Sequence, residues 1–175
     1  SPDPPPEHLV AGEWEGRLGW PMVVKPSDQG STVGLSVVDE AEGMAAAVEK
    51  AAAYGPRVLV ERFIPGREVT VAALEGRALP PIEIHPEHGI YDYECKYTPG
   101  MSSYTCPAVL EPAQTRRVQE IALAAFEVLG HRDYSRLDFR LGADVVFYLL
   151  EGNTAPGFTA TSLVPKAAAA AGIGF

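Results

Sequence analysis

The chain has 175 residues, 46% hydrophobic and 21% charged, with 14 Lys plus Arg against 23 Asp plus Glu and a formal net charge of −9. This is the composition of a globular domain, and it excludes a fibrous or wholly disordered chain. Because no apolar run approaches the roughly 20 residues that span a bilayer and no basic cluster offsets the acidic balance, we expect neither a membrane segment nor a nucleic-acid partner.

The first part of the chain predicts a linker followed by a hairpin and a helix. Residues 1–18 are expected to be a linker or truncated segment, because the first eight are polar and proline-rich; they also lack the features of a signal peptide, which indicates a cytosolic protein. Strands are predicted over residues 19–25 and 33–38, joined by a polar loop that contains glycine. Helical spacing of apolar residues predicts a helix over residues 41–54, with Asp39 as its cap.

The rest of the chain interleaves strands and helices. In order we predict strands over residues 57–63, 67–74 and 79–85, a long loop over 86–107, a helix over 112–129, strands over 134–141 and 145–150, and a helix over 164–171. The long loop carries four tyrosines, and because long loops in compact domains are usually functional, we expect it to cover a substrate site. Since strands and helices do not alternate strictly, the order favours the α+β class over a doubly wound sheet.

Two pairs of polar residues stand near the facing ends of the last two predicted strands. Arg136 and Asp138 are two apart on one strand, and Glu151 and Asn153 are two apart at the end of the next, so each pair shares a face. A two-residue turn at Ala143-Asp144 would place Arg136 opposite Glu151 and all four side chains on one face. A three-residue turn would separate the pairs unless a β-bulge intervened.

Oxygen donors among these residues are of the kind that Mg²⁺ prefers. Asp138, Glu151 and Asn153 supply carboxylate and amide oxygens, with no His or Cys that would indicate zinc. The alternative is a surface salt-bridge cluster around Arg136, which spacing alone does not exclude. The hydroxyl-rich, glycine-containing residues 154–162 follow directly and could turn backbone N–H groups toward an anion. Their position beside the oxygen donors favours a functional site over a plain loop.

The first predicted hairpin loop is a second candidate site. Lys25 ends a strand and is followed by Gly30, Ser31, Thr32 and Gly34, so a positive charge, hydroxyls and exposed backbone could surround a phosphate. The order differs from a Walker loop, in which the lysine follows the glycines and opens a helix. A plain hairpin loop is the alternative, and taken alone this pattern is weak.

Glu61 and Glu68 flank the apolar pair Phe63-Ile64. Such an arrangement could place an adenine ring against apolar groups and direct the carboxylates to its amino group and to ribose hydroxyls. Without further context, solvated carboxylates at strand ends are the simpler interpretation.

Five segments together resemble the D-alanine–D-alanine ligases of the ATP-grasp superfamily. They run in order through the chain over residues 24–34, 61–68, 91–97, 136–138 and 150–165. The resemblance implies an ATP-grasp fold of two α+β lobes with nucleotide bound between them, a small lobe over residues 19–65 and a large lobe over 66–175. It implies an ATP-dependent enzyme that joins two D-alanines through a D-alanyl phosphate intermediate for peptidoglycan precursor synthesis.

The resemblance also implies roles for residues at matching positions. Nucleotide would be bound by Lys25, Ser31, Thr32, Val33, Gly34, Glu61, Arg62, Ile64, Glu68 and Lys96, and two Mg²⁺ ions, for which Mn²⁺ can substitute, by Asp138, Glu151 and Asn153. Arg136 and the Gly157 backbone N–H would stabilise the oxyanion of the tetrahedral intermediate, with Ser31 and Tyr97 as further catalytic residues. The second D-alanine would lie against Ser162 and Leu163, and Tyr97 on a mobile loop favours a dipeptide product.

Three positions depart from the family pattern, and part of the family's sequence is missing. Gly152 replaces a larger apolar residue and is expected to add backbone freedom between two metal ligands, Thr32 replaces a common Ser, and Asp133 occupies a usual Gly position. Members of the family carry an amino-terminal domain that supplies much of the first D-alanine site. We therefore expect little turnover by this chain alone. For the complete protein the resemblance implies a homodimer, and the absence of signal-peptide features indicates a cytoplasmic location.

Two other functions stay open at this stage. One is an ATP-grasp carboxylate–amine ligase with other amino-acid substrates, and the other is a non-catalytic nucleotide-binding module. The complete set formed by Lys25, Arg136, Asp138, Glu151 and Asn153 argues against the second, because binding alone would not require it.

Overall fold

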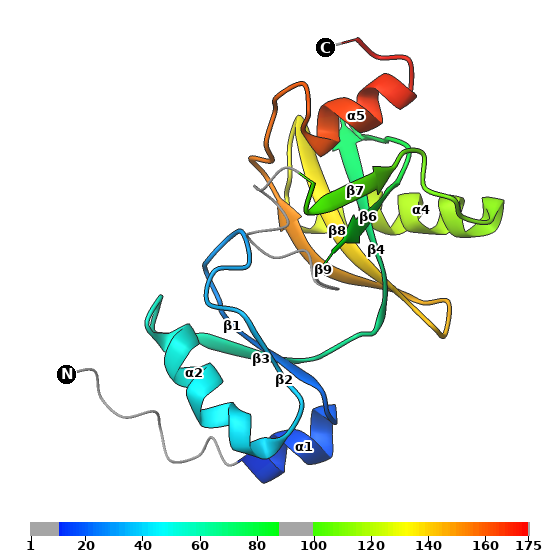
Figure 1. The fold of residues 1–175 in the computed structure, drawn as a ribbon. Coiled ribbons are helices and arrows are strands. Elements are labelled where there is room, and N and C mark those ends of the chain that lie inside the picture. The colour runs from blue at the N-terminus through cyan, green and yellow to red at the C-terminus, as the bar shows by residue number, and fades with distance from the viewer. Residues whose placement is uncertain (1–10, 88–99, 175) are drawn as a thin grey trace. The chain divides into compact units, whose positions relative to one another are not determined.

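The computed structural model describes residues 11–87 and 100–174, which divide between Phe63 and Ile64 into two units (Figure 1). Each unit has its own β-sheet. No helix in the described ranges combines the length and apolarity needed to cross a membrane. The mixture of antiparallel sheets and helices confirms the α+β class.

The first unit is a three-stranded antiparallel sheet with helices packed against it. Its elements are α1 (Ala11–Leu18), β1 (Met22–Pro26), β2 (Ser36–Val38), the 3₁₀ turn η1 (Ala41–Gly43), α2 (Met44–Ala52) and β3 (Val58–Arg62), with strand order β2-β1-β3. The β1–β2 pairing confirms the predicted hairpin. Residues recurring at helical spacing on α2 are buried against Met22, Val24 and Val38, as the periodicity predicts; they are Met44, Ala47, Val48 and Ala51.

Two predictions for this unit are wrong. Residues 11–18, expected to be linker, form α1, because Trp14 and Leu18 stand four residues apart and pack together against the core of the unit. Asp39 does not cap the helix that follows β2. The chain enters that helix through η1, which begins after an extended Glu40 and has no side-chain cap.

The second unit is a larger antiparallel sheet covered by a helix on each face. Its elements are β4 (Gly66–Leu74), β5 (Arg77–Ala78), β6 (Ile82–Pro86), β7 (Ser102–Thr105), α4 (Pro112–Val128), β8 (Tyr134–Gly142), β9 (Phe147–Asn153) and α5 (Leu163–Ala170). The strand order is β7-β6-β4-β8-β9, and β5 pairs with β4. Strand β7 falls within residues 86–107, expected to be a loop, and it pairs with β6 through Ser102–Thr105.

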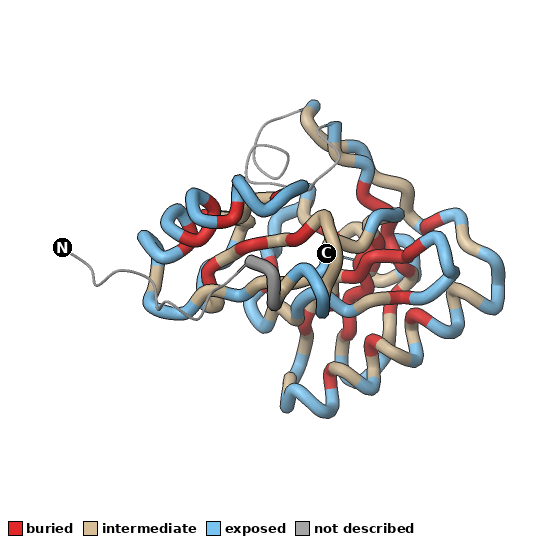
Figure 2. The backbone as a smooth tube through the Cα atoms, turned by 90° about the horizontal axis from the view of Figure 1, so that it is seen from below, coloured by how far each residue is buried: buried red, intermediate tan, exposed pale blue. Residues whose placement is uncertain are grey.

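Alternation along β4 explains how both faces are covered. Val69, Val71 and Ala73 are buried with residues of α4, whereas Ala72 is buried with residues of α5. Figure 2 shows buried residues in the strands and at intervals along the helices, as expected where one stripe of each helix faces a sheet. Arg136 and Asp138 on β8 pair with Ala72 and Thr70, which places them on the α5 side of this sheet.

Candidate functional site

The β8–β9 hairpin brings the two polar pairs together, and its turn decides between the two alternatives left open by the sequence. Its turn has three residues, 143–145, closed by hydrogen bonds from the Gly142 N–H to the Val146 carbonyl at 2.9 Å and from the Val145 N–H to the Gly142 carbonyl at 3.0 Å. Val145 occupies the left-handed region with φ of 64°. Of the two turns considered above, the structure has the three-residue one.

A β-bulge restores the common face. Phe139 lies opposite Leu149, but Asp138 lies opposite Glu151, so Leu150 is an extra residue on β9. Asp138 thus pairs with Glu151, and Arg136 with Asn153, a shift of two residues along β9 from the register that a two-residue turn would give. The third residue of the turn alone would put the two pairs on opposite faces. The bulge residue Leu150 reverses that change, so all four side chains share one face.

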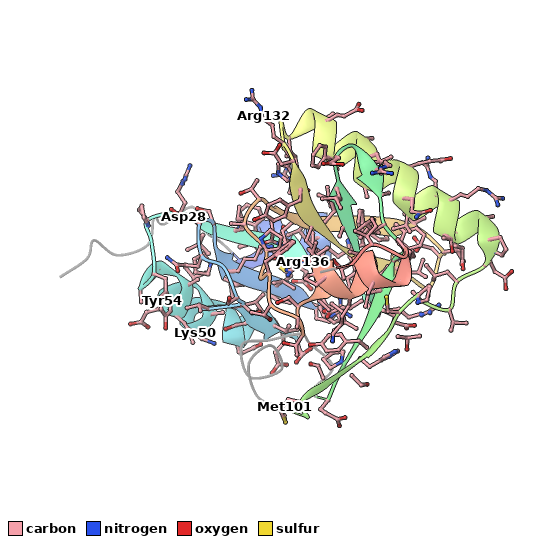
Figure 3. All side chains as sticks on the ribbon, turned by 90° about the horizontal axis from the view of Figure 1, so that it is seen from above. Asp28, Lys50, Tyr54, Met101, Arg132 and Arg136 are labelled. Atoms are coloured by element: carbon pink, nitrogen blue, oxygen red, sulfur yellow. The ribbon has the colours of Figure 1, made fainter. Side chains whose placement is uncertain are left out.

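The carboxylate of Asp138 is held by three side chains from three strands. Arg136 donates from Nε to Oδ1 at 2.8 Å and from Nη2 to Oδ2 at 2.7 Å, while the Thr70 hydroxyl donates to Oδ1 at 2.7 Å. Asn153 Nδ2 donates to Oδ2 at 3.1 Å. The side chains of Arg136 and Asp138 are only 16% and 18% exposed, which differs from the solvated surface cluster considered above. Figure 3 shows Arg136 among packed side chains, whereas Arg132 extends outward.

The two carboxylates converge on one point. Nδ2 of Asn153 lies 3.1 Å from Oδ2 of Asp138 and 3.2 Å from Oε1 of Glu151, so one small group contacts both carboxylates. A cation between the two carboxylates could bind both oxygens, and a half-turn of the Asn153 amide would put an oxygen in place of its nitrogen as a third donor. Within the described ranges no three His, Cys, Asp or Glu side chains gather as a metal site, so two carboxylates and an amide make up this donor set.

Three hydroxyl groups gather in the loop between β9 and α5. Oγ of Ser162 accepts a hydrogen bond from the Thr159 N–H at 3.0 Å and lies 2.9 Å from Oγ1 of Thr159, which is 3.2 Å from Oγ1 of Thr161. Ser162 therefore turns its side chain into the loop, although it precedes the first residue of α5. A Cβ on Gly157 would lie 3.1 Å from Oγ of Ser162, so the glycine lets the backbone approach this hydroxyl.

Leu163 lies at the first turn of α5, and its side chain is buried in the core. Any contribution of Leu163 to a ligand would therefore come from its backbone.

In the first unit, Lys25 and Glu61 lie on neighbouring strands and form an ion pair of 2.6 Å between Nζ and Oε2. Arg62, on the same strand as Glu61, instead donates from Nε to the Leu18 carbonyl at 2.9 Å, at the end of α1. Two of the expected nucleotide-binding residues, Lys25 and Glu61, thus contact each other, whereas a third, Arg62, contacts the end of α1.

The loop between β1 and β2 has an unusual backbone. Ser31, Thr32 and Gly34 all have positive φ, at 55°, 64° and 75°. Ser31 and Thr32 therefore adopt a conformation that residues other than glycine rarely take. Gly34 is required here, because a Cβ would lie 2.7 Å from Cδ2 of Tyr54 and 2.9 Å from Cγ of Pro26. Val33 lies within the same turn, with its N–H bonded to the Gly30 carbonyl at 3.3 Å.

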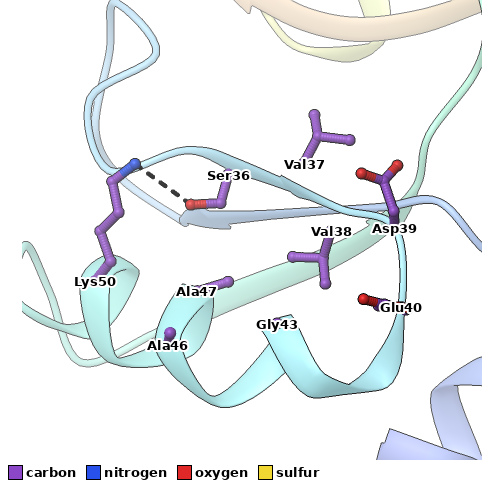
Figure 4. A pocket seen from close by; sticks show the side chains of 9 residues that line it. All are labelled: Ser36, Val37, Val38, Asp39, Glu40, Gly43, Ala46, Ala47 and Lys50. Carbon is purple, nitrogen blue, oxygen red and sulfur yellow. Dashed lines mark hydrogen bonds between the residues drawn. The ribbon is translucent and has the colours of Figure 1, made fainter.

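A pocket of about 410 Å³ also lies in the first unit, between β2 and α2 (Figure 4). Lys50 reaches across its end and donates to the Leu35 carbonyl at 2.8 Å and to Oγ of Ser36 at 3.3 Å. None of the expected site residues lines this pocket.

Glu68 is held by a residue that the sequence analysis missed. Nη2 of Arg140 lies 3.1 Å from Oε1 of Glu68, with side-chain exposures of 8% and 11%, and Nη1 donates to the Gly66 carbonyl at 2.9 Å. Ile64 lies two residues before Gly66, where β4 begins. Arg140 continues the two-residue spacing of Arg136 and Asp138, and that spacing is the signal that could have revealed it.

Thr70 was also missed, because its contact with Asp138 depends on the β4–β8 register, for which the sequence contains no local signal. Lys96 and Tyr97 lie outside the described residues.

Comparison with known proteins places this arrangement in context. A family model described as D-ala D-ala ligase C-terminus matches residues 6–175. A D-alanine–D-alanine ligase of Nitratidesulfovibrio vulgaris is 48% identical over 166 residues, which cover 94% of this chain and 55% of that protein. The corresponding ligase of Methylacidiphilum infernorum is 48% identical over 173 residues, covering 98% of this chain and 57% of that protein.

Solved structures agree with the sequence matches. The VanG D-Ala:D-Ser ligase from Enterococcus faecalis has a TM-score of 0.85 at 32% identity, covering 96% of this chain and 50% of that one. A D-alanine–D-alanine ligase from Bacillus anthracis complexed with ATP has a TM-score of 0.76 at 30% identity, covering 91% of this chain and 50% of that one. The chain thus spans about half the length of the relatives it matches.

Proposed function

The chain belongs to the D-alanine–D-alanine ligase family, which has the ATP-grasp fold, and from that premise we propose that the protein to which it contributes joins two D-alanines with conversion of ATP to ADP and phosphate. The observation that carries the proposal is that the Asp138 and Glu151 carboxylates both contact the Asn153 amide nitrogen, with Arg136 bound to Asp138. The hydroxyl groups of residues 159–162 lie in the loop that follows β9.

The reaction has two steps. A carboxylate oxygen of the first D-alanine attacks the γ-phosphorus of ATP, which forms D-alanyl phosphate and releases ADP. The amine of the second D-alanine then attacks the acyl carbon, phosphate leaves, and the amine loses a proton to give the dipeptide.

The metal requirement would be met on the second unit. Asp138, Glu151 and Asn153 would hold Mg²⁺, in two ions as the family resemblance implies, and Mn²⁺ can take its place. Bound metal would partly neutralise the negative charge of the phosphates. Arg136, fixed by two hydrogen bonds to Asp138, keeps a positive charge where negative charge develops on the oxyanion, and the Gly157 N–H donates to the same oxygen. Preorganisation of this kind accelerates the chemical step.

Residues of each unit are proposed to contact substrate or nucleotide. Ser162 and the backbone of Leu163 bind the carboxylate of the second D-alanine, while Lys25 and the loop from Ser31 to Gly34 bind phosphate oxygens. Lys25 then exchanges its pairing with Glu61 for the phosphates, which releases Glu61 for the adenine. Adenosine contacts are completed by Arg62, Ile64 and Glu68, and Lys96 and Tyr97 close over the site.

For the complete protein we propose a cytoplasmic homodimer that supplies peptidoglycan precursors and binds neither nucleic acid nor membrane. The division into a small lobe over residues 19–65 and a large lobe over 66–175 belongs to the same proposal. Alone, this chain is expected to show less than about 1% of the complete protein's turnover, since a missing substrate site worth about 2.7 kcal/mol accounts for a hundredfold loss.

The test is a substrate panel on the complete protein, with ADP release and dipeptide formation measured together. We expect MgATP-dependent D-alanyl-D-alanine formation, a loss of at least about a hundredfold in kcat/KM for Asp138→Asn, and unchanged activity for Asp144→Asn, which alters an exposed carboxylate on the turn of the same hairpin. Dipeptides from other amino acids only would indicate a different carboxylate–amine ligase. Nucleotide binding without any turnover would indicate a binding module.

A further inference from the structure

Gly152 stands between Glu151 and Asn153 on β9, and the space beside it is filled. Because side chains alternate along a strand, residue 152 faces away from its two neighbours and toward the side of the sheet covered by α4. A Cβ built on Gly152 would lie 2.7 Å from Cε1 of His131 and 3.1 Å from Cδ1 of both Leu129 and Leu137. Any residue other than glycine would displace the His131 ring.

The His131 ring is held by its surroundings. Its backbone N–H donates to the Phe126 carbonyl at 2.9 Å, and its ring packs edge-on against that of Phe126, with centroids 5.8 Å apart and an interplanar angle of 88°. Its Nδ1 atom is buried without a hydrogen-bond partner among the described residues. A buried nitrogen without a partner costs stability, so an apolar side chain would suit the packing better than this imidazole does.

We infer that His131 is a positioning residue whose ring, seated against the α-carbon of Gly152, holds the strand segment that carries Glu151 and Asn153. The inference rests on the proposed metal-binding role of these two residues. It also replaces the expectation of added backbone freedom at Gly152, because three side chains pack where its Cβ would be. A small shift of this segment would separate the two carboxylates that converge on one point, since the Asp138 carboxylate is fixed independently by Arg136 and Thr70.

The test is a double-mutant cycle in which binding of the Mn²⁺–ATP complex to each variant is measured by calorimetric titration. The variants are Gly152→Ala, His131→Ala and the combination, with Val128→Ala as a matched control from the exposed end of α4, where Val128 is 87% exposed. Thermal unfolding of each variant is followed by circular dichroism.

We expect Gly152→Ala to weaken Mn²⁺–ATP binding at least tenfold, because its methyl group meets the His131 ring. The combined variant should bind within threefold of His131→Ala, since removing the ring leaves room for the methyl, and Val128→Ala should bind like wild type. Wild-type affinity of either Gly152→Ala or His131→Ala, or losses in the combined variant that multiply those of the single variants, would overturn the inference. Failure of wild type to bind Mn²⁺–ATP would instead overturn the metal site on which the inference rests.

Discussion

Arg67 and Glu83 form a bidentate ion pair that joins two strands of the larger sheet. Nε of Arg67 donates to Oε1 of Glu83 and Nη2 donates to Oε2, both at 2.6 Å, and Nη2 also donates to the Val109 carbonyl at 2.8 Å. The hydrogen bonds from Arg67 lower the pKa of the Glu83 carboxyl, against the opposing effect of burial. The pair therefore links β4, β6 and the segment before α4 in a pH-dependent manner.

Replacing Glu83 with Gln should destabilise the chain at neutral pH and not at acid pH. Because the folded-state pKa lies below the unfolded value, the stabilisation is present above the unfolded pKa of about 4.3 and is lost as the pH falls through the folded pKa. We expect Glu83→Gln to lower the free energy of unfolding by roughly 1 to 2 kcal/mol at pH 7. Urea unfolding at several pH values measures this difference.

Glu75→Gln is the matched control, because Glu75 pairs with Arg77 at 3.6 Å with both side chains more than 70% exposed, at 73% and 72%. Such exposed pairs contribute little. A difference between Glu83→Gln and wild type that is as large at pH 3 as at pH 7 would disprove an ionic origin.

Individual residues of the site could be predicted where strand alternation or the family pattern gave a signal. The two-residue spacing identified Arg136 with Asp138 and Glu151 with Asn153, and these four share a face in the structure. The partner of Glu68 was missed, although Arg140 follows the same spacing, and Thr70 could not be predicted because strand neighbours distant in sequence depend on a register that is set by the whole sheet.

At the level of elements, the β8–β9 hairpin determines where the metal-binding candidates lie. Its three-residue turn places Val145 at φ of 64°, a conformation that β-branched residues rarely adopt and that usually carries glycine in such turns. This substitution of valine for the expected glycine is why the sequence did not indicate the length of the turn. The bulge at Leu150 could not be predicted either, because Leu150 is one of several consecutive apolar residues and nothing in the sequence distinguishes it from its neighbours.

Val145→Gly should therefore stabilise the hairpin. Relief of the left-handed strain, which costs about 1 to 2 kcal/mol, outweighs the entropy that glycine gains on unfolding, and a net gain near 1 kcal/mol raises the unfolding midpoint by about 2 to 4 °C. Val146→Gly is the control: its φ is not positive, so the same change should lower the midpoint. A lower midpoint for Val145→Gly would contradict the turn geometry described above.

Helices and strands with strong periodicity were predicted closely, and short elements were not. The helix expected over residues 112–129 is α4, from Pro112 to Val128, because its apolar stripe is long and proline and glycine mark its ends. Helix α1 and strand β7 were missed, since eight and four residues are too few for a clear period. Their positions depend on packing within the folded units.

At the scale of the whole molecule, composition and periodicity predict the α+β class but do not identify the family. The family assignment came from five motifs in the correct order, and the matching family model and solved relatives agree with it. Both units contain residues that are expected to bind ATP or its magnesium. In the first unit these are Lys25 and the β1–β2 loop, and in the second they lie on the β8–β9 hairpin. The central claim is that these residues act on MgATP.

The most direct test is a calorimetric titration of MgATP into this chain, with a magnesium-free run, the Asp138→Ala variant and Asp144→Asn as the matched control. The account predicts binding by wild type and Asp144→Asn that disappears without magnesium and in Asp138→Ala. Binding of equal affinity without magnesium or in Asp138→Ala, or no binding by a chain shown to be folded by circular dichroism, would contradict it.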